Sequence, residues 1–345
     1  MTGPVPVFDG HNDVLLQLWQ AQDRAGAGFF TGLSGHLDLA KCRTGGFAGG
    51  LFAIWVRGPQ AADPDPDDPA PVFRPLGTDR ARDITLQMAA TLLRMARTQA
   101  DDFALCTSVD AVEAARAAGR IAAVMHLEGA EGIGPDLDEL HLLHAAGLRS
   151  IGPVWSRDNI FGHGVPFRFP ASPDTGPGLT EAGRRLVREA EALGLVIDLS
   201  HMNQKGFWEV AQHSHGPLVA SHSGVHALCP ASRNLTDRQL DAISERQGLV
   251  GLNLAVQFLR ADGARNSDTP LETVIRHLDH LLARLGEGGV ALGSDFDGAV
   301  MPRGIGSAAG LPALIAAMRM AGWGEALIAR ICWGNWLDLL RRVIG

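Results

Sequence analysis

The sequence predicts an α/β fold, a (β/α)8 barrel of the TIM type, from three observations. Short apolar runs alternate with segments of helical periodicity along the whole chain, and such runs are typical of strands buried on both faces of a parallel sheet. Eight such runs in 345 residues suit a closed barrel. No G-x-G-x-x-G motif follows a strand, which argues against an open dinucleotide-binding sheet. No linker or repeat divides the chain, so we expect a single domain over residues 1–345.

The predicted strands are the apolar runs, taken in chain order. They are residues 5–8, 50–56, 121–125, 150–155, 195–199, 217–220, 249–254 and 290–293. Between them, apolar residues recur at helical spacing over residues 83–99, 179–193 and 271–285. Thr180 is placed to cap the second of these helices.

Two proline-rich segments are predicted to be long loops. Residues 59–75 follow the second strand and residues 162–178 follow the fourth. Both lie at the end of the barrel where active sites form, so we expect them to roof a pocket.

Composition and charge narrow the class of protein. With 46% hydrophobic and 20% charged residues, the chain is an ordinary globular protein. Its formal net charge of −8 argues against nucleic acid as a partner, because phosphate binding needs a clustered excess of Lys and Arg. No run approaches the roughly 20 apolar residues that span a bilayer, and no signal peptide is evident, so we expect a cytoplasmic protein without membrane contact. The four cysteines form no C-x-x-C pair and are predicted to be buried free thiols.

Residues that can bind metal ions stand at the ends of the first, third, fifth, sixth and last predicted strands. Because the carboxyl ends of all barrel strands meet at one mouth, residues nearly 300 positions apart are expected to converge there. These residues are His11, Asp13, Glu128, His201, His222, Asp295 and Asp297.

Three imidazoles and several carboxylates form a mixed nitrogen and oxygen set, which suits Zn²⁺ and leaves Mn²⁺ or Fe²⁺ open. Two ions roughly 3.5–4 Å apart can share one activated hydroxide. One ion would take His11 and Asp13, and the other His201 and His222, with Glu128 between them.

A lone histidine at a strand end is more often a hydrogen-bonded structural group, and the joint placement of five residues is what indicates a metal centre. The histidines outside this set are interpreted as structural, and Asp9 and Asp297 as turn caps; these histidines are His126, His141, His144, His213, His215, His226, His277 and His280.

The motifs around these residues, taken in order, resemble those of the membrane dipeptidase (renal dipeptidase) family of zinc peptidases, peptidase family M19, in a bacterial-type version. The similar segments run the length of the chain: residues 9–15, 35–39, 45–47, 127–133, 147–149, 199–201, 221–224, 232–234 and 293–298.

The resemblance implies a barrel of the metal-dependent amidohydrolase kind with two Zn²⁺ per chain. His11, Asp13, Glu128, His201 and His222 match the family's metal ligands, with Glu128 as the bridge. Arg233 matches the arginine that binds the substrate's C-terminal carboxylate, and Asp295 matches the acidic residue beside the bridging water.

The sequence departs from the family at Trp155, which stands where the animal enzymes have a histidine thought to stabilise the tetrahedral intermediate. An indole has one N–H donor and cannot become cationic, so it cannot replace an imidazolium. We interpret Trp155 as a substrate-binding residue that signals a different substrate preference, and Arg157 or His163 as the nearby sources of charge.

The resulting hypothesis is a dipeptidase in which a metal-bridging hydroxide attacks the peptide bond, Asp295 moves the proton and Arg233 holds the free carboxylate. Its substrate is a dipeptide, with a D-residue at the C-terminal position left open, as are β-lactams and a homodimer. Two alternatives are another two-metal amidohydrolase, such as an N-acyl amino acid deacylase or a lactonase, and a catalytically inactive metal-binding barrel.

Overall fold

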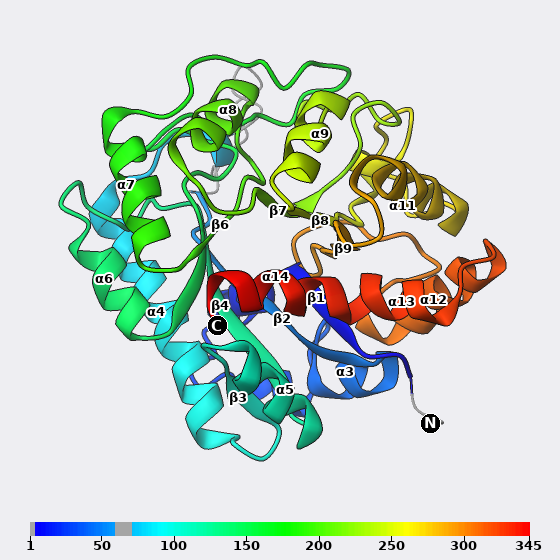
Figure 1. Cartoon of the computed structure of the whole chain (residues 1–345). Helices are drawn as coiled ribbons and strands as arrows, with labels where there is room; N and C mark the ends of the chain where they lie inside the picture. Colours follow the sequence, from blue (N-terminus) through cyan, green and yellow to red (C-terminus); the bar gives the residue numbers. More distant parts are fainter. Residues whose placement is uncertain (1–3, 59–70) are drawn as a thin grey trace.

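Parallel strands pair in a ring in the computed structural model, which describes residues 4–58 and 71–345 (Figure 1). One sheet has the order β1-β2-β4-β5-β6, and a second has the order β7-β8-β9. The strands are β1 Val7–Asn12, β2 Phe47–Trp55, β3 Phe103–Leu105, β4 Ile121–Glu128, β5 Leu148–Gly152, β6 Val196–Ile197, β7 Val219–Ser223, β8 Leu249–Leu252 and β9 Val290–Leu292.

Two parallel bridges close these sheets into one barrel. Asp198, just after β6, pairs with Val219 of β7, and Asn12 of β1 pairs with Phe296 beyond β9. The ring therefore reads β1-β2-β4-β5-β6-β7-β8-β9, and the (β/α)8 prediction is confirmed. The sequence reading missed β3, a three-residue strand that pairs only with the first residues of β4 and lies outside the ring.

Helices follow most of the strands and form the outer layer. They are α1 Val14–Gln20, α2 Ala27–Thr31, α3 Leu39–Gly45, α4 Thr78–Thr98, α5 Val109–Ala117, α6 Asp138–Ala145, α7 Glu181–Ala192, α8 Gln204–His213, α9 Asp237–Glu245, α10 Val256–Leu259, α11 Leu271–Leu285, α12 Leu311–Met320, α13 Glu325–Ala329 and α14 Asn335–Val343, with short helical turns η1 Pro71–Phe73, η2 Ala308–Gly310 and η3 Arg330–Gly334.

The three predicted helices are confirmed. The bounds of α11 agree with the prediction, and α7 begins after the predicted cap, where the Thr180 hydroxyl accepts a hydrogen bond from Gly183 N at 3.1 Å. Helix α4 begins earlier than predicted, at Thr78, because its first turns are polar and lack the apolar spacing that marks a helix. The loop over residues 162–178 is also confirmed, whereas residues 59–70 of the other predicted loop lie outside the described residues.

One end of the barrel is closed by the C-terminal helix α14, which crosses the centre of Figure 1. Trp336 of α14 is fully buried, lies 6.0 Å from the Phe8 ring and donates its indole N–H to Leu292 O at 2.9 Å. The residues packed there come from both α14 and the strands, among them Leu51, Val124, Val196, Val219 and Leu249. Because α14 closes this end of the barrel, we look for a functional site at the other end, where the carboxyl ends of the strands lie.

The barrel wall is so tightly packed that three strand positions admit only glycine. A Cβ atom would come within 2.2 Å of Ser221 O at Gly10, and within 2.0 Å of the same oxygen at Gly251 and at Gly293. The Ser221 carbonyl belongs to the backbone of β7 and cannot yield without disturbing that strand, so these glycines let β1, β8 and the end of β9 approach β7.

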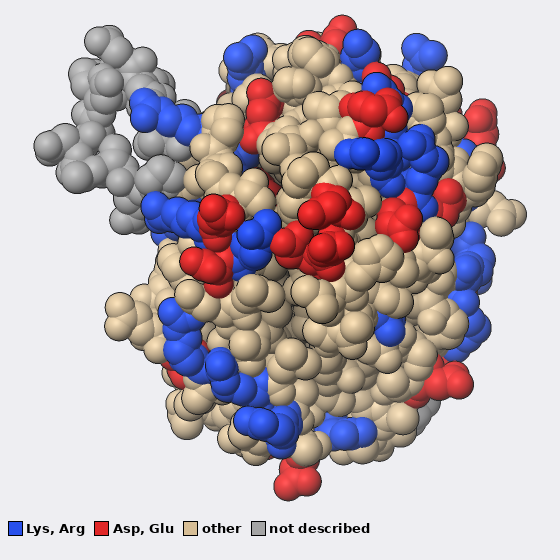
Figure 2. Space-filling view, turned by 90° about the vertical axis from the view of Figure 1, so that its left-hand side faces the viewer, with Lys and Arg blue, Asp and Glu red and all other residues tan. Residues whose placement is uncertain are grey.

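The distribution of surface charges and the burial of the cysteines agree with what the composition predicts. Acidic side chains lie among the basic ones on the face drawn in Figure 2, which is the left-hand side of Figure 1. All four cysteines are buried and free, as predicted. Within the described ranges, none of the helices has both the length and the apolar character needed to cross a membrane.

Replacing Gly251 with alanine is expected to destabilise the fold by about 1–3 kcal/mol, because the new methyl group overlaps Ser221 O. Urea unfolding would measure the loss. Gly324→Ala is the control, since Gly324 is exposed and has nothing within 4 Å of the added Cβ; it should change stability by at most about 0.5 kcal/mol. Equal stability of the two variants would contradict the packing argument.

Candidate metal centre

Five residues predicted to bind metal meet at the mouth of the barrel. His11 lies in β1, Asp13 directly follows it, Glu128 ends β4, and His222 lies in β7. His201 stands in the turn after β6. All five are buried, with 0–4% of their surface exposed. The structure therefore brings together residues from four separate parts of the chain, as the strand-end argument requires.

One carboxylate oxygen lies at the centre of the group. Glu128 Oε1 is 2.8 Å from His201 Nε2, 3.3 Å from His222 Nε2 and 3.6 Å from His11 Nε2. Asp13 Oδ2 lies 3.4 Å from His11 Nε2 on the far side. Three imidazole nitrogens thus face a single carboxylate.

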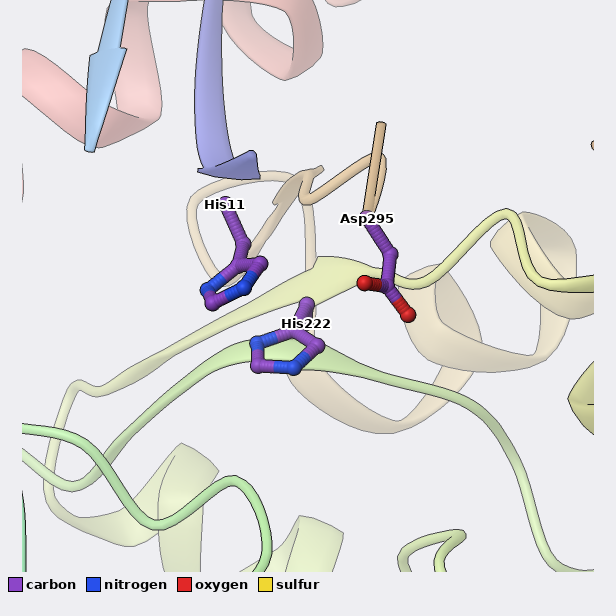
Figure 3. Close-up of side chains that lie close together, drawn as sticks. All are labelled: His11, His222 and Asp295. Carbon is purple, nitrogen blue, oxygen red and sulfur yellow. The ribbon is translucent and has the colours of Figure 1, made fainter. Parts of the chain in front are cut away.

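Two sets of candidate ligands share Glu128. One comprises His11, Asp13 and Glu128, and the other comprises Glu128, His201 and His222; within each set the ligand atoms lie within 4.8 Å of one another. This is the division that the sequence predicts. A third set joins His11 and His222 to Asp295, and Figure 3 shows these two rings facing each other beside the carboxylate, with ring centroids 3.8 Å apart.

The protonation states of His201 and His222 suit metal binding. Burial lowers the pKa of His201 and of His222 well below the usual value, so both rings are neutral and offer a lone pair. Burial also raises the pKa of Glu128 well above its ordinary value, which means that its ionised form needs a positive partner.

The surroundings of His11 give the clearest indication that the site lacks a positive charge. Burial lowers its pKa, but the carboxylates of Glu128 and Asp13 outweigh this and raise it to about 10. Among the described residues, neither ring nitrogen of His11 has a hydrogen-bond partner, and Asp13 Oδ1 has none either. Buried polar atoms are rarely left in this state. A bound cation would satisfy His11 Nε2 and Asp13 Oδ1, so the residues fit a metal centre.

Serine hydroxyls orient two of the imidazoles. Ser221 Oγ donates to Asp198 Oδ2 at 2.5 Å and lies 2.7 Å from His222 Nδ1, so it accepts the Nδ1 hydrogen. This fixes the tautomer that turns the Nε2 lone pair toward Glu128. Ser156 Oγ lies 2.7 Å from His201 Nδ1 and holds that ring in the same manner.

Backbone strain marks the same region. His201 has a φ of 70° and Asp295 a φ of 63°, in the left-handed region that residues other than glycine rarely adopt. Asp295 is also held through Asn253, whose Nδ2 donates to Asp295 Oδ2 at 3.0 Å. The strain is maintained by surrounding structure and aims both side chains into the mouth.

Arg233 lies behind the histidines and is buried, with 4% of its surface exposed. Its Nη1 donates to Ser223 Oγ at 2.8 Å and its Nη2 to His222 O at 2.9 Å. Its Nε has no partner among the described residues. A guanidinium has five N–H donors, so three remain for a ligand. Its burial excludes a surface salt bridge.

Above the candidate metal ligands lies a cavity of about 530 Å³, within the usual range for small-ligand sites. Glu128, His201 and Asp295 form part of its floor. Five aromatic side chains form what we call the aromatic wall: Trp55, Phe73, Trp155, Phe167 and Phe258. Trp155 is the centre of this wall, 5.4 Å from Phe73, 5.0 Å from Trp55 and 5.6 Å from Phe167, measured between ring centroids.

The two charged residues considered near Trp155 lie elsewhere. His163 is paired with Asp158 at 3.0 Å, and neither it nor Arg157 lines the cavity. Arg157 is buried behind the wall, with its guanidinium carbon 5.1 Å from the Trp155 ring and 5.7 Å from the Trp55 ring. Neither residue therefore places its charge in the cavity lining, although the positive charge of Arg157 adds to burial in lowering the pKa of His201.

Arg157 instead ties the wall together. Its Nε donates to Glu131 Oε1 at 2.6 Å, and its Nη groups donate to Val56 O at 2.5 Å and Val72 O at 3.4 Å. These carbonyls belong to the segments that carry Trp55 and Phe73. One buried ion pair thus joins the loops after β2, β4 and β5.

The histidines interpreted as structural lie outside the candidate ligand sets of the described residues. His277, for example, is buried and bonded to Leu259 O and Val225 N. Asp9 and Asp297, predicted to cap turns, bond instead to distant segments. Asp9 accepts from Ser294 N and Ser294 Oγ, and Asp297 accepts from His36 N.

Sequence reasoning missed several supporting residues. Asp198 lies in the same short motif as His201, so its proximity to the site was a usable signal. The Arg157–Glu131 pair and four of the five aromatic wall residues carried no such signal, because their positions depend on how long loops fold back over the barrel.

Comparison with known proteins agrees with this geometry. Residues 2–344 match the family model described as membrane dipeptidase (peptidase family M19). An uncharacterised protein of Klebsiella pneumoniae, from the pqqA 5′ region, is 49% identical over 261 residues, covering 76% of this chain and 96% of that protein.

Two solved structures resemble the whole chain. A metallopeptidase from Rhodobacter sphaeroides, liganded with a phosphinate mimic of the dipeptide L-Ala-D-Ala, is 51% identical with a TM-score of 0.94. A metallopeptidase of family M19 described as dipeptidase AC is 52% identical with a TM-score of 0.91. Each comparison covers 99% of both chains.

Replacing Glu131 with alanine is expected to destabilise the protein by about 3–5 kcal/mol, because it leaves the Arg157 guanidinium buried without its counter-charge. Chemical unfolding of the two proteins measures the difference. Glu113→Ala breaks an exposed pair with Arg341 and serves as the control, with an expected loss of about 0–1 kcal/mol. A Glu131 variant as stable as the control would show that Arg157 finds its support elsewhere.

Proposed function

The chain belongs to the membrane dipeptidase family of metal-dependent peptidases, and on that premise we propose that it is a binuclear zinc dipeptidase. Its substrates in this proposal are dipeptides with a free C-terminal carboxylate, including those with a D-residue in that position. The observation that carries the proposal is the shared Glu128 oxygen between two sets of ligands, His11 with Asp13 and His201 with His222.

The donor set favours zinc. Three imidazoles and two carboxylates are ligands that Zn²⁺ takes in hydrolases, and serines already contact the second ring nitrogen of His201 and of His222. When bound, two Zn²⁺ ions would lower the pKa of a shared water toward neutrality and polarise the substrate carbonyl. Everything else in the reaction falls to the residues of the chain.

Asp295 is the proposed proton carrier. It lines the cavity beside His11 and His222, and Asn253 holds one of its oxygens. Burial raises its pKa above the ordinary value, which moves a carboxyl group toward the range where it can both accept and return a proton. In our proposal Asp295 takes the proton from the attacking water and delivers it to the leaving amine.

Arg233 is the proposed anchor for the carboxylate. Its three remaining donors include Nε, the only one of its nitrogens without a partner among the described residues. Since the guanidinium is already fixed by Ser223 and His222, binding a carboxylate costs it little further ordering. An anchor this close to the histidines limits substrates to one residue beyond the scissile bond.

The acceptance of D-residues is supported by the Rhodobacter sphaeroides relative, whose bound phosphinate mimics L-Ala-D-Ala. In this proposal the carboxylate anchor constrains the C-terminal residue through its charge and not its side chain.

Asp295→Asn is expected to lower kcat about 10²- to 10⁴-fold while two zinc ions per chain remain bound. Steady-state hydrolysis of a dipeptide and metal analysis of the purified variant measure the two quantities. Asp79→Asn, at a position whose side chain is 98% exposed, is the matched control and should retain full activity. Turnover close to normal in the Asp295 variant would remove the proton-carrier role, whereas loss of metal would reassign Asp295 as a ligand.

Arg233→Gln should abolish the preference for a free carboxylate. For the unaltered protein, kcat/KM should be higher for a dipeptide than for its C-terminal amide, and the ratio should fall about 10- to 150-fold in the variant, as expected for a charge-assisted hydrogen bond. The ratio is read within each protein, so a general loss of activity cancels. An unchanged ratio would show that the carboxylate binds elsewhere.

A further inference from the structure

The aromatic wall is continuous across the mouth of the barrel. Phe258 contacts Phe167 at 5.2 Å between ring centroids, Phe167 contacts Trp155, and Trp155 stacks on Phe73 at 12° between planes. Trp155 also lies 5.5 Å from the His201 ring. An apolar surface therefore begins at the proposed metal ligands and extends outward from them.

The wall is presented to the cavity and is rigid. Phe167 keeps 41% of its surface exposed although it is a large apolar side chain at the edge of a pocket. Behind the wall, Arg157 lies against Trp155 and Trp55 and is bonded to the loops that carry Trp55 and Phe73. A preformed apolar surface that is left open in this way gains stability when an apolar ligand covers it.

The ring of strands assigns the two ends of the substrate to opposite sides of the mouth. Arg233 is bonded to His222 and Ser223 of β7. In the order β1-β2-β4-β5-β6-β7-β8-β9, the strand opposite β7 is β2, and β2 ends at Trp55. A dipeptide anchored by its carboxylate at Arg233 therefore extends across the centre of the mouth toward Trp55, Phe73 and Trp155.

We propose that the N-terminal residue of the substrate carries a large apolar side chain, aromatic or branched aliphatic, that packs against Trp55, Phe73 and Trp155. This inference rests on the proposed dipeptidase function and names the substrate class for it. The wall then acts as the specificity surface for the N-terminal residue, whereas Arg233 reads only the carboxylate of the C-terminal residue.

Arg57 is the residue that would favour an acidic side chain at the N-terminal position of the substrate. It follows Trp55 by two residues and lines the same cavity, so an acidic N-terminal side chain would find a cation there. Trp155 contacts both Trp55 and Phe73, whereas Arg57 is half-buried and Arg265, which also lines the cavity, is exposed. The apolar side chain is the better match, because the three rings offer the larger surface from which water is displaced.

The experiment compares kcat/KM for the zinc-loaded protein on two dipeptide series. In the series Xaa-Ala, Xaa is Gly, Ala, Leu, Phe or Glu; in the series Ala-Xaa the same residues occupy the C-terminal position. We expect kcat/KM to rise about tenfold or more from Ala-Ala to Leu-Ala and Phe-Ala, with a smaller change in the second series. Binding of phosphinate analogues of Phe-Ala and Gly-Ala, followed by titration calorimetry, gives the same comparison without turnover.

The variant Phe73→Ala should lower the ratio of Phe-Ala to Gly-Ala about threefold or more, in kcat/KM and in analogue affinity, with the ratio read within each protein. Phe169→Ala is the matched control, since Phe169 is 40% exposed on the same rim but does not line the cavity. Arg57→Gln should leave the Phe-Ala to Gly-Ala ratio unchanged.

Three results would overturn the inference while leaving the dipeptidase proposal intact. These are equal rates across the Xaa-Ala series, a stronger selection in the Ala-Xaa series, and a preference for Glu-Ala that Arg57→Gln removes. Failure to hydrolyse any dipeptide in either series would instead overturn the proposed function itself.

Discussion

The structure depends on the placement of one carboxylate oxygen, Glu128 Oε1, within 3.6 Å of three imidazole nitrogens. Burial opposes the charge on Glu128, and the same burial keeps His201 and His222 neutral. Such a cluster is costly in a folded protein unless a cation neutralises it. The arrangement is therefore explained by metal binding and by little else. The surrounding structure serves to hold these groups in place before any ligand arrives.

The scaffold meets that demand by bringing strand ends into close contact. Glycines at positions 10, 251 and 293 let three segments approach Ser221 O to distances that no side chain permits. Ser221 itself belongs both to this packing and to the site, since its hydroxyl links Asp198 to His222. The residue that sets the spacing of the wall thus also sets the orientation of an imidazole. Fold stability and site geometry are consequently coupled at the end of β7.

The sequence was informative where a local pattern maps onto a position in the barrel. Eight apolar runs predicted eight strands, and polar residues at their ends predicted Glu128 and the four candidate ligands that lie around it. It was uninformative where tertiary contacts decide. Strand β3 has only three residues and exists because β4 offers it an edge. Arg157 stood out as a source of charge, but its distance from the cavity depends on Glu131, which no spacing links to it.

Trp155 brings these two kinds of information together. The resemblance of the sequence to the membrane dipeptidase family implied that an indole stands where the animal enzymes have an imidazole, and an indole cannot supply positive charge. The structure places that indole against His201, Trp55 and Phe73, as the central member of an apolar surface. Because a cation bound at Glu128 and His201 would lie close to the developing negative charge, electrostatic stabilisation need not come from position 155. In our proposal Trp155 instead contributes to the recognition of a substrate side chain, as the central residue of the apolar surface.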